Sequence, residues 1–261
     1  MGRFYTNAVL SACLAVGGVT ASIPAAAQTK ATAPAKPVVA NPVEVKEAND
    51  LYEFRYVYPA QAAAIPALKK WLETDLTKQR SDIIESARET KSYLEEGDFF
   101  SPHTHETEWK VVTNLPSWLS LSASVWEYTG GAHGNSWPKA VIWDKQANVR
   151  RSALDLFVSK AAFTAAVRVP FCRALNLEQS KRRGEPVNPK DGGFSACPDP
   201  ADTPVLLGSS NKTHFTRIGI VLPPYAAGPY SEGFYEFTLP VTPAVIKAVK
   251  PQYRAAFAVG R

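Results

Sequence analysis

The sequence lacks the short motifs that mark the common catalytic sites of enzymes. It contains no G-x-S-x-G nucleophile turn, no Walker-type phosphate loop and no G-x-G-x-x-G after a predicted strand. Concentrated charge is also scarce: the 261 residues carry a net charge of +5, and the one dense basic run is Lys181-Arg182-Arg183. Such a run is typical of a solvated helix end, so we expect no nucleic-acid partner. These absences favour a protein that binds over one that catalyses.

Long apolar runs are missing as well. The mostly apolar stretch 8–23 is too short and too rich in small residues for a membrane span, which takes about 20 apolar residues. It follows Arg3 and precedes Ala25 and Ala27, which is the order of a secretory signal peptide. We therefore predict that residues 1–27 are a signal peptide, that the protein is periplasmic, and that no transmembrane segment remains after cleavage.

Two alternatives to this interpretation remain. The run from Leu10 to Cys13 matches a lipobox, in which Cys13 would be lipidated and become the new N-terminus. The apolar stretch could also be a buried N-terminal helix of the folded protein.

Cysteine is rare, and its number fits export. Loss of Cys13 with the signal peptide leaves Cys172 and Cys197, and an even pair in an oxidising compartment usually forms a disulfide. The closed loop of about 25 residues predicts on the order of 3 kcal/mol of stabilisation. The alternative is a pair of unrelated buried thiols.

Composition separates a tether from a folded domain. Residues 28–46 are dominated by Ala, Pro, Lys, Thr and Val, which predicts a flexible tether. Residues 47–261 are numerous enough for one substantial core, and six tryptophans with a hydrophobic content of 45% indicate a globular body.

Hydrophobic periodicity predicts the elements of that domain. Alternation over 51–58 and 118–128 indicates strands, and spacings of three and four residues over 60–96 indicate a long helix. Ser152 and Asp155 form a capping box that opens a second helix. The other expected elements are strands at 108–114, 138–143, 215–222 and 233–239, a long loop over 184–212 and a short helix at 244–250. The sequence thus predicts an α+β fold, with an antiparallel sheet packed against a long N-terminal helix and further helices.

Two loop segments are the candidate ligand-binding residues. The first holds Gly130, Gly131, Ala132 and His133 between two predicted strands, where glycines allow positive φ values and a close approach of the backbone. The second is a stiff proline- and tyrosine-rich segment that offers rigid contact area; its candidate residues are Pro224, Tyr225, Gly228, Pro229 and Tyr230. The alternative for both is structural: a wide hairpin turn pinned by the histidine to a backbone carbonyl, and a corner whose tyrosines pack on the sheet.

Histidines supply the one candidate metal site. His103 and His105, in a predicted loop at 98–105, could join His133 in a three-imidazole zinc site. Zinc motifs normally show tighter paired spacings, so we expect neither a metal nor another cofactor.

The order of these motifs resembles the RsiV/PdaC-type extracytoplasmic domain. The resemblance covers about residues 47–250 and is carried by the segments 128–133 and 224–230, with an Asp-Leu-Phe helix between them. It implies a sheet flanked by helices and, as in the RsiV domain, capture of lysozyme through loops. We therefore expect a periplasmic, non-enzymatic binding module for a cell-wall component or a wall-degrading enzyme such as lysozyme, so that lysozyme or peptidoglycan is the expected partner. The alternatives are a metal-dependent hydrolase acting on the cell envelope and a structural envelope protein.

Overall fold

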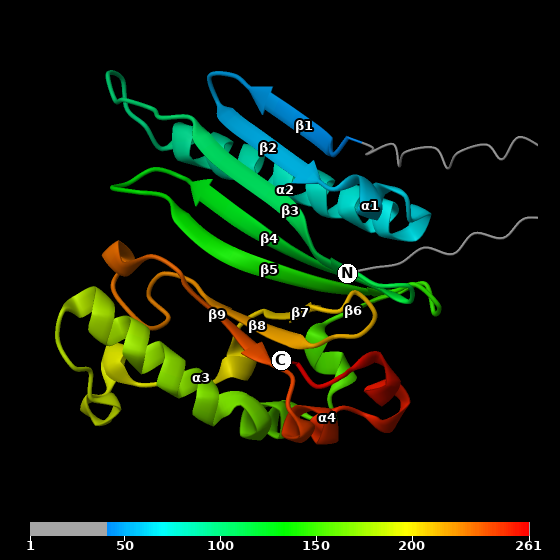
Figure 1. Ribbon diagram of the computed structural model, residues 1–261. Coiled ribbons are helices and arrows are strands. Elements are labelled where there is room, and N and C mark those ends of the chain that lie inside the picture. The colour runs from blue at the N-terminus through cyan, green and yellow to red at the C-terminus, as the bar shows by residue number, and fades with distance from the viewer. Residues whose placement is uncertain (1–40, 261) are drawn as a thin grey trace, which may run out of the picture. The chain divides into compact units, whose positions relative to one another are not determined.

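The computed structural model describes residues 41–260, which form two sheets and the helices that cover them (Figure 1). The first sheet has the strand order β1-β2-β3-β4-β5-β6, and the second has the order β7-β8-β9. The strands are β1 (Val43–Ala48), β2 (Tyr52–Tyr58), β3 (His103–Asn114), β4 (Trp118–Tyr128), β5 (Asn135–Asp144), β6 (Val149–Arg151), β7 (Val205–Gly208), β8 (Arg217–Leu222) and β9 (Tyr235–Pro240). The α-helices are α1 (Ala60–Ala63), α2 (Pro66–Ser92), α3 (Lys160–Arg183) and α4 (Pro243–Ala248).

The first sheet is mixed, because β2 and β3 run parallel. Helix α2 connects these two strands and carries the chain back to the end from which β2 began, and a parallel pair needs such a crossover. All other strand pairs are antiparallel. The predicted α+β class is therefore confirmed. The expected antiparallel sheet contains one parallel pair, and a second sheet accompanies it.

The two cores lie on opposite faces of the first sheet. On one face, Leu68 and Leu72 of α2 pack with Tyr56 of β2, Trp109 of β3 and Leu121 of β4. Truncation of either leucine to alanine would cost about 2–5 kcal/mol.

The second core joins the other face of the first sheet to the second sheet and α3. Strand β7 contacts β3, β4 and β5, and Trp118 and Ile142 belong to the same buried cluster as Ile218 of β8 and Phe171 of α3. The layer order is thus α2, first sheet, second sheet, α3 (Figure 1).

The structure confirms two local predictions, the disulfide and the capping box. The disulfide between Cys172 and Cys197 is present, with Cα atoms 5.5 Å apart, and the capping box of Ser152 and Asp155 is formed. The tether was expected to reach residue 46, but β1 already begins at Val43, where alternate residues are half-buried against β2. The predicted signal peptide, Cys13 and the tether up to residue 40 lie outside the described residues. No helix within residues 41–260 is long and apolar enough to cross a membrane.

Candidate recognition site

The β4–β5 connection, residues 129–134, is hereafter the glycine loop. Gly130 and Gly131 adopt φ values of +98° and +92°, which side chains strongly disfavour. Gly134 is required for a different reason: a Cβ atom there would lie 2.6 Å from the ring of Trp126. Each of these glycines therefore has a steric role in the turn, which agrees with the sequence-based reasoning.

The β8–β9 connection, residues 223–234, is hereafter the proline–tyrosine loop. Tyr225 has a φ of +70°, a left-handed conformation that costs a non-glycine residue about 1–3 kcal/mol. The backbone N–H of Tyr225 donates to the carbonyl of Gly228 at 3.0 Å, which closes the turn. A Cβ atom at Gly228 would collide with the carboxylate of Glu232. The surrounding contacts thus hold Tyr225 in a strained conformation that presents its side chain outward, 51% exposed.

The two loops are in direct contact. The ring of His133 stacks on that of Tyr230, with centroids 4.0 Å apart and planes inclined by 22°. The hydroxyl of Tyr230 donates to the carbonyl of Gly134 at 2.9 Å, and the hydroxyl of Tyr225 lies 3.5 Å from Nε2 of His133. His133 Nδ1 lies 2.9 Å from the carbonyl of Gly134, which is the pinning contact that the structural alternative predicted. Two segments from different sheets therefore form one continuous surface.

Most of the predicted binding residues are accessible on this surface. We define the loop-pair surface by its exposed members, which are Gly130, Gly131, Ala132, His133, Tyr225 and Pro229. Pro224 and Tyr230 are half-buried, and Gly228 is buried, so Gly228 acts in the shape of the turn rather than at its surface.

The last turns of α3 anchor the proline–tyrosine loop from behind. Arg183 pairs with Glu232 through two contacts of 2.8 and 3.1 Å, and its Nη2 also donates to the carbonyl of Ala227 at 3.0 Å. Arg182 donates to the carbonyl of Glu232 at 2.5 Å and stacks over the Tyr235 ring at 3.9 Å. The sequence suggested a solvated helix end here: Lys181 and Arg182 are exposed, whereas Arg183 is half-buried. The carboxylate partner of Arg183 lies far along the chain, so local spacing gave no sign of it, whereas Arg182 also pairs with Glu178 one turn earlier in α3.

Electrostatics reinforce this anchor. The hydrogen bonds from Arg183 hold the pKa of Glu232 below its usual range. Burial, together with a hydrogen bond from Tyr235 to Glu232, raises the pKa of the Tyr235 phenol to about 12. Glu232 is therefore ionised and Tyr235 protonated at neutral pH, which keeps all their contacts to the loop favourable.

The disulfide-closed segment shares the same anchor. The amide nitrogen of Gln179, a buried residue of α3, donates to the carbonyls of both Ala227 and Phe194, at 2.8 and 2.7 Å. Phe194 lies just before Cys197, and its side chain is 43% exposed. The disulfide-closed segment and the proline–tyrosine loop are thus bound by the same side chain of α3, an arrangement that the sequence did not reveal.

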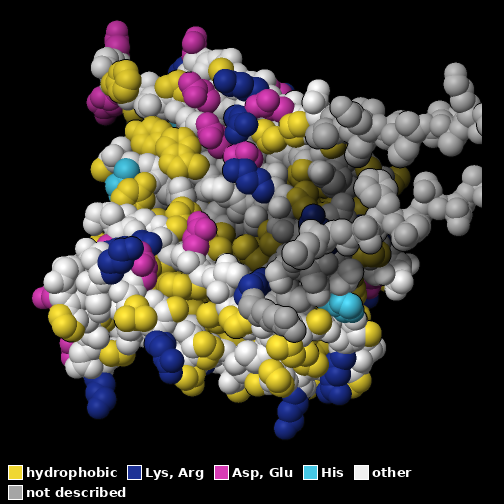
Figure 2. Space-filling model, viewed as in Figure 1, with side chains coloured by type: hydrophobic (Ala, Val, Ile, Leu, Met, Phe, Trp, Pro, Cys, Tyr) yellow, Lys and Arg dark blue, Asp and Glu magenta, His cyan; other side chains and the backbone are white. Residues whose placement is uncertain are grey.

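The α2–β3 connection, residues 93–102, lies at the same end of the first sheet. Thr104 pairs with Tyr128, which places the start of β3 beside the start of the glycine loop. This connection exposes Tyr93 and Phe99, by 77% and 88%, and contains three acidic residues and no basic one. Figure 2 shows hydrophobic side chains gathered over this end of β3 and β4, with acidic side chains beside them. Two exposed aromatic side chains and three acidic residues thus lie at this end of the first sheet.

The three histidines are not arranged as a metal site. His103 and His105 belong to strand β3 rather than to the predicted loop, and both are buried, whereas His133 is exposed. His105 lies 2.8 Å from Glu127 and 2.5 Å from Gln79 of α2; His103 stacks on Phe100, and burial lowers its pKa. Residues 41–260 contain no group of three or more His, Cys, Asp or Glu side chains that could hold a metal ion.

Comparison with known proteins gives one family match and a shared fold. Residues 45–136 match the family model described as deacetylase PdaC. A DUF3298 family protein from Pseudomonas aeruginosa is 16% identical, with a TM-score of 0.50 over 85% of this chain and 96% of that chain. A DUF3298 family member from Bacteroides fragilis is 17% identical, with a TM-score of 0.46 over 77% and 89% of the two chains. No curated protein matches this chain.

Proposed function

We propose that this chain, which is PdaC-like over residues 45–136, is a non-enzymatic binding module of the cell envelope that recognises its ligand through the loop-pair surface. The observation that carries the proposal is the contact between His133 and Tyr230, which joins two stiff loops into one accessible surface. Holding Tyr225 in a left-handed conformation stores strain of the kind found at functional sites. Loops that are rigid before binding lose little entropy on association.

The proposed ligand is a cell-wall component or a wall-degrading enzyme such as lysozyme. The overall charge of +5 opposes a basic partner such as many lysozymes. Locally the balance is reversed, because Glu95, Glu96 and Asp98 lie beside the exposed Phe99 at the same end of the sheet as the glycine loop. Acidic groups around exposed aromatic side chains suit a basic protein surface.

We further propose that the chain works outside the cytoplasm, in the periplasm. The Cys172–Cys197 disulfide supports this location, since such bonds persist in oxidising compartments.

Retention on immobilised lysozyme, and separately on peptidoglycan sacculi, tests the proposal. The wild-type protein should be retained on one of them, and His133→Ala and Tyr225→Ala should lower the retained fraction. Val169→Ala is the matched control, because Val169 is 69% exposed on α3 and makes no part of the loop-pair surface. Failure of the wild-type protein to bind either material would remove both proposed ligands.

A purely structural role for the loops is the second candidate. It is favoured by the hydrogen bond from Tyr230 to Gly134, which ties the two sheets together whether or not a ligand exists. On that account Tyr230→Ala should lower stability, while Tyr225→Ala should change neither stability nor retention.

A further inference from the structure

Strand β5 has a free edge along most of its length. It pairs with β4 from Asn135 to Asp144, whereas β6 covers only Ile142, Trp143 and Asp144 on the other side. Among the described residues, no strand pairs with that second edge over 135–141. An open edge presents backbone N–H and C=O groups to any extended chain that can reach it.

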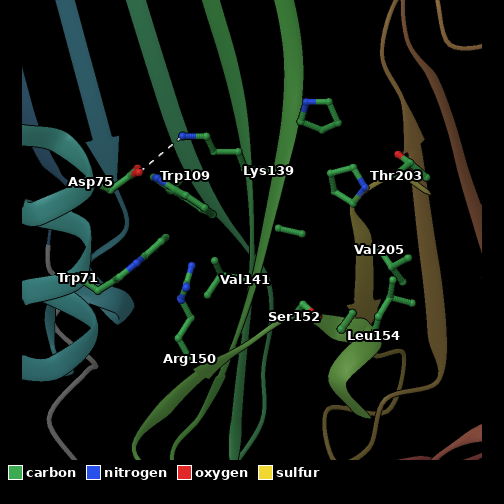
Figure 3. Close-up of a pocket in the computed structure, with 14 residues that line it drawn as sticks. Trp71, Asp75, Trp109, Lys139, Val141, Arg150, Ser152, Leu154, Thr203 and Val205 are labelled. Carbon is green, nitrogen blue, oxygen red and sulfur yellow. Dashed lines mark ion pairs between the residues drawn. The ribbon is translucent and has the colours of Figure 1, made fainter. Parts of the chain in front are cut away.

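A cavity of about 370 Å³ lies against this edge (Figure 3). Four consecutive residues of β5, Pro138 to Val141, line it. Successive side chains of a strand point to opposite faces of the sheet, so a cavity that touches all four lies against the edge of the strand rather than on one face. Figure 3 shows Trp71, Asp75 and Trp109 on one side of β5, with Thr203 and Val205 on the other.

A second cavity, of about 330 Å³, shares Pro138 and Lys139 with the first. Its other walls include Ser122 and Ser124 of β4, which alternate with the residues that face α2, and Leu206 of β7. The second cavity therefore lies between the two sheets, on the face of the first sheet that is turned away from α2. A strand added at the open edge of β5 would direct alternate side chains toward the first cavity.

The position of Pro138 indicates which backbone groups of β5 face the unpaired edge. Pro138 has no N–H, and within a sheet proline is placed with its nitrogen toward the unpaired side. Because backbone groups alternate between the two edges of a strand, Ser136 and Ala140 then turn their N–H and C=O groups to the open side as well. These residues could form ladder hydrogen bonds with an incoming chain.

The first cavity, which includes Trp71 and Asp75 of α2, carries an excess of positive charge. Lys139 is compensated by Asp75, at 3.7 Å, and Asp75 also accepts hydrogen bonds from Tyr56 and Gln79. Arg150 lies over the ring of Trp71, with its guanidinium carbon 5.0 Å from the ring centroid, and forms no ion pair with a carboxylate of residues 41–260. The remaining positive charge suits a carboxylate on the ligand.

We propose that the free edge of β5 binds an extended acidic peptide segment of another protein by strand addition, with a carboxylate of that peptide facing Arg150. Ladder hydrogen bonds supply affinity in this mode of binding, and pockets for alternate side chains supply specificity. This site shares no residue with the loop-pair surface, so it goes beyond the function proposed above. The opposing account is that Pro138 and Lys139 only protect an open edge from aggregation, a common use of both residue types.

A pair of synthetic peptides tests the proposal on the purified protein. Acetyl-Thr-Glu-Val-Glu-Val-Thr-amide should bind at least about tenfold more tightly than the same peptide with lysine in place of glutamate, a preference of about 1.4 kcal/mol. Binding should slow the hydrogen exchange of the Ser136 and Ala140 amides. Equal affinities, no binding of either peptide, or unchanged exchange at both amides would overturn the proposal.

Matched variants distinguish peptide binding at the β5 edge from general effects of charge or misfolding. Ala140→Pro, which removes one edge donor, should abolish binding, whereas Ala140→Gly keeps the N–H and should bind within about threefold of wild type. Arg150→Glu should reverse the preference between the two peptides. Lys247→Glu, the same charge change at an exposed residue of α4, should leave it unchanged. If Ala140→Pro proves unfolded by circular dichroism, the Arg150→Glu reversal decides, and its absence would contradict the proposal.

Discussion

The ring of His133 lies on the ring of Tyr230, with their centroids 4.0 Å apart, although one belongs to a loop of the first sheet and the other to a loop of the second. This stacking, with the hydrogen bond from Tyr230 to the carbonyl of Gly134, fixes how the two loops present their exposed side chains. The relationship gives the loop-pair surface a defined shape before any ligand arrives.

The hydroxyl and the ring of Tyr230 should contribute separately to stability. Tyr230→Phe removes only the hydrogen bond to Gly134 and should lower the free energy of unfolding by about 1 kcal/mol. Tyr230→Ala also removes the stacking on His133 and should cost about 2–3 kcal/mol. Urea unfolding followed by circular dichroism measures both values, and equal losses would show that the stacking contributes nothing.

Two glycines of the same loop should respond differently to alanine. Gly131→Ala places a Cβ in open space but at a φ of +92°, so the cost is backbone strain of about 1–2 kcal/mol. Gly134→Ala drives a Cβ against the Trp126 ring and should cost more, about 3 kcal/mol, with a shift in tryptophan fluorescence. The reverse order in thermal unfolding would contradict the described packing of Trp126.

The fold could be predicted from the sequence where local pattern decides it. Alternation identified β2 and β4, helical spacing identified α2, and the even cysteine pair identified the disulfide. The parallel pairing of β2 with β3 and the separation of a second sheet depend on contacts between distant segments, which leave no periodic sign in the chain.

The sequence predicted the two loops of the candidate site but not the residues of α3 that anchor one of them. The glycine- and proline-rich segments stand out by composition, and the structure brings them together. Arg183 and Gln179 were not recognised, because a basic or amide residue in a helix gives no indication of a loop partner far away in the sequence. The three-histidine hypothesis failed because β3 begins at His103, which places both His103 and His105 in the core.

Acid should weaken the anchor of the proline–tyrosine loop. Arg183 lowers the pKa of Glu232 in the folded protein relative to the unfolded chain. The stabilisation is therefore complete above the unfolded pKa of about 4.3 and is lost as the pH falls through the lower folded value. Glu232→Gln should reduce the slope of unfolding free energy against pH between about pH 3 and 5. Parallel curves for variant and wild type in urea titrations would contradict this role.

Loss of the disulfide should destabilise the fold and loosen the proline–tyrosine loop. Cys172→Ala/Cys197→Ala should lower the free energy of unfolding by on the order of 3 kcal/mol. The amides around Ala227 should exchange faster, because Gln179 binds both Ala227 and the disulfide segment at Phe194. A reducing agent should reproduce both effects in the wild-type protein and change nothing in the double variant.

A hydrogen-exchange footprint of the protein with lysozyme or with solubilised peptidoglycan fragments tests the central claim most directly. The account predicts slower exchange of amides in the glycine loop and the proline–tyrosine loop on addition of one of these ligands, and loss of that protection in Tyr225→Ala. Protection confined to other parts of the chain, or unchanged protection in the variant, would contradict the claim that these two loops form the binding surface.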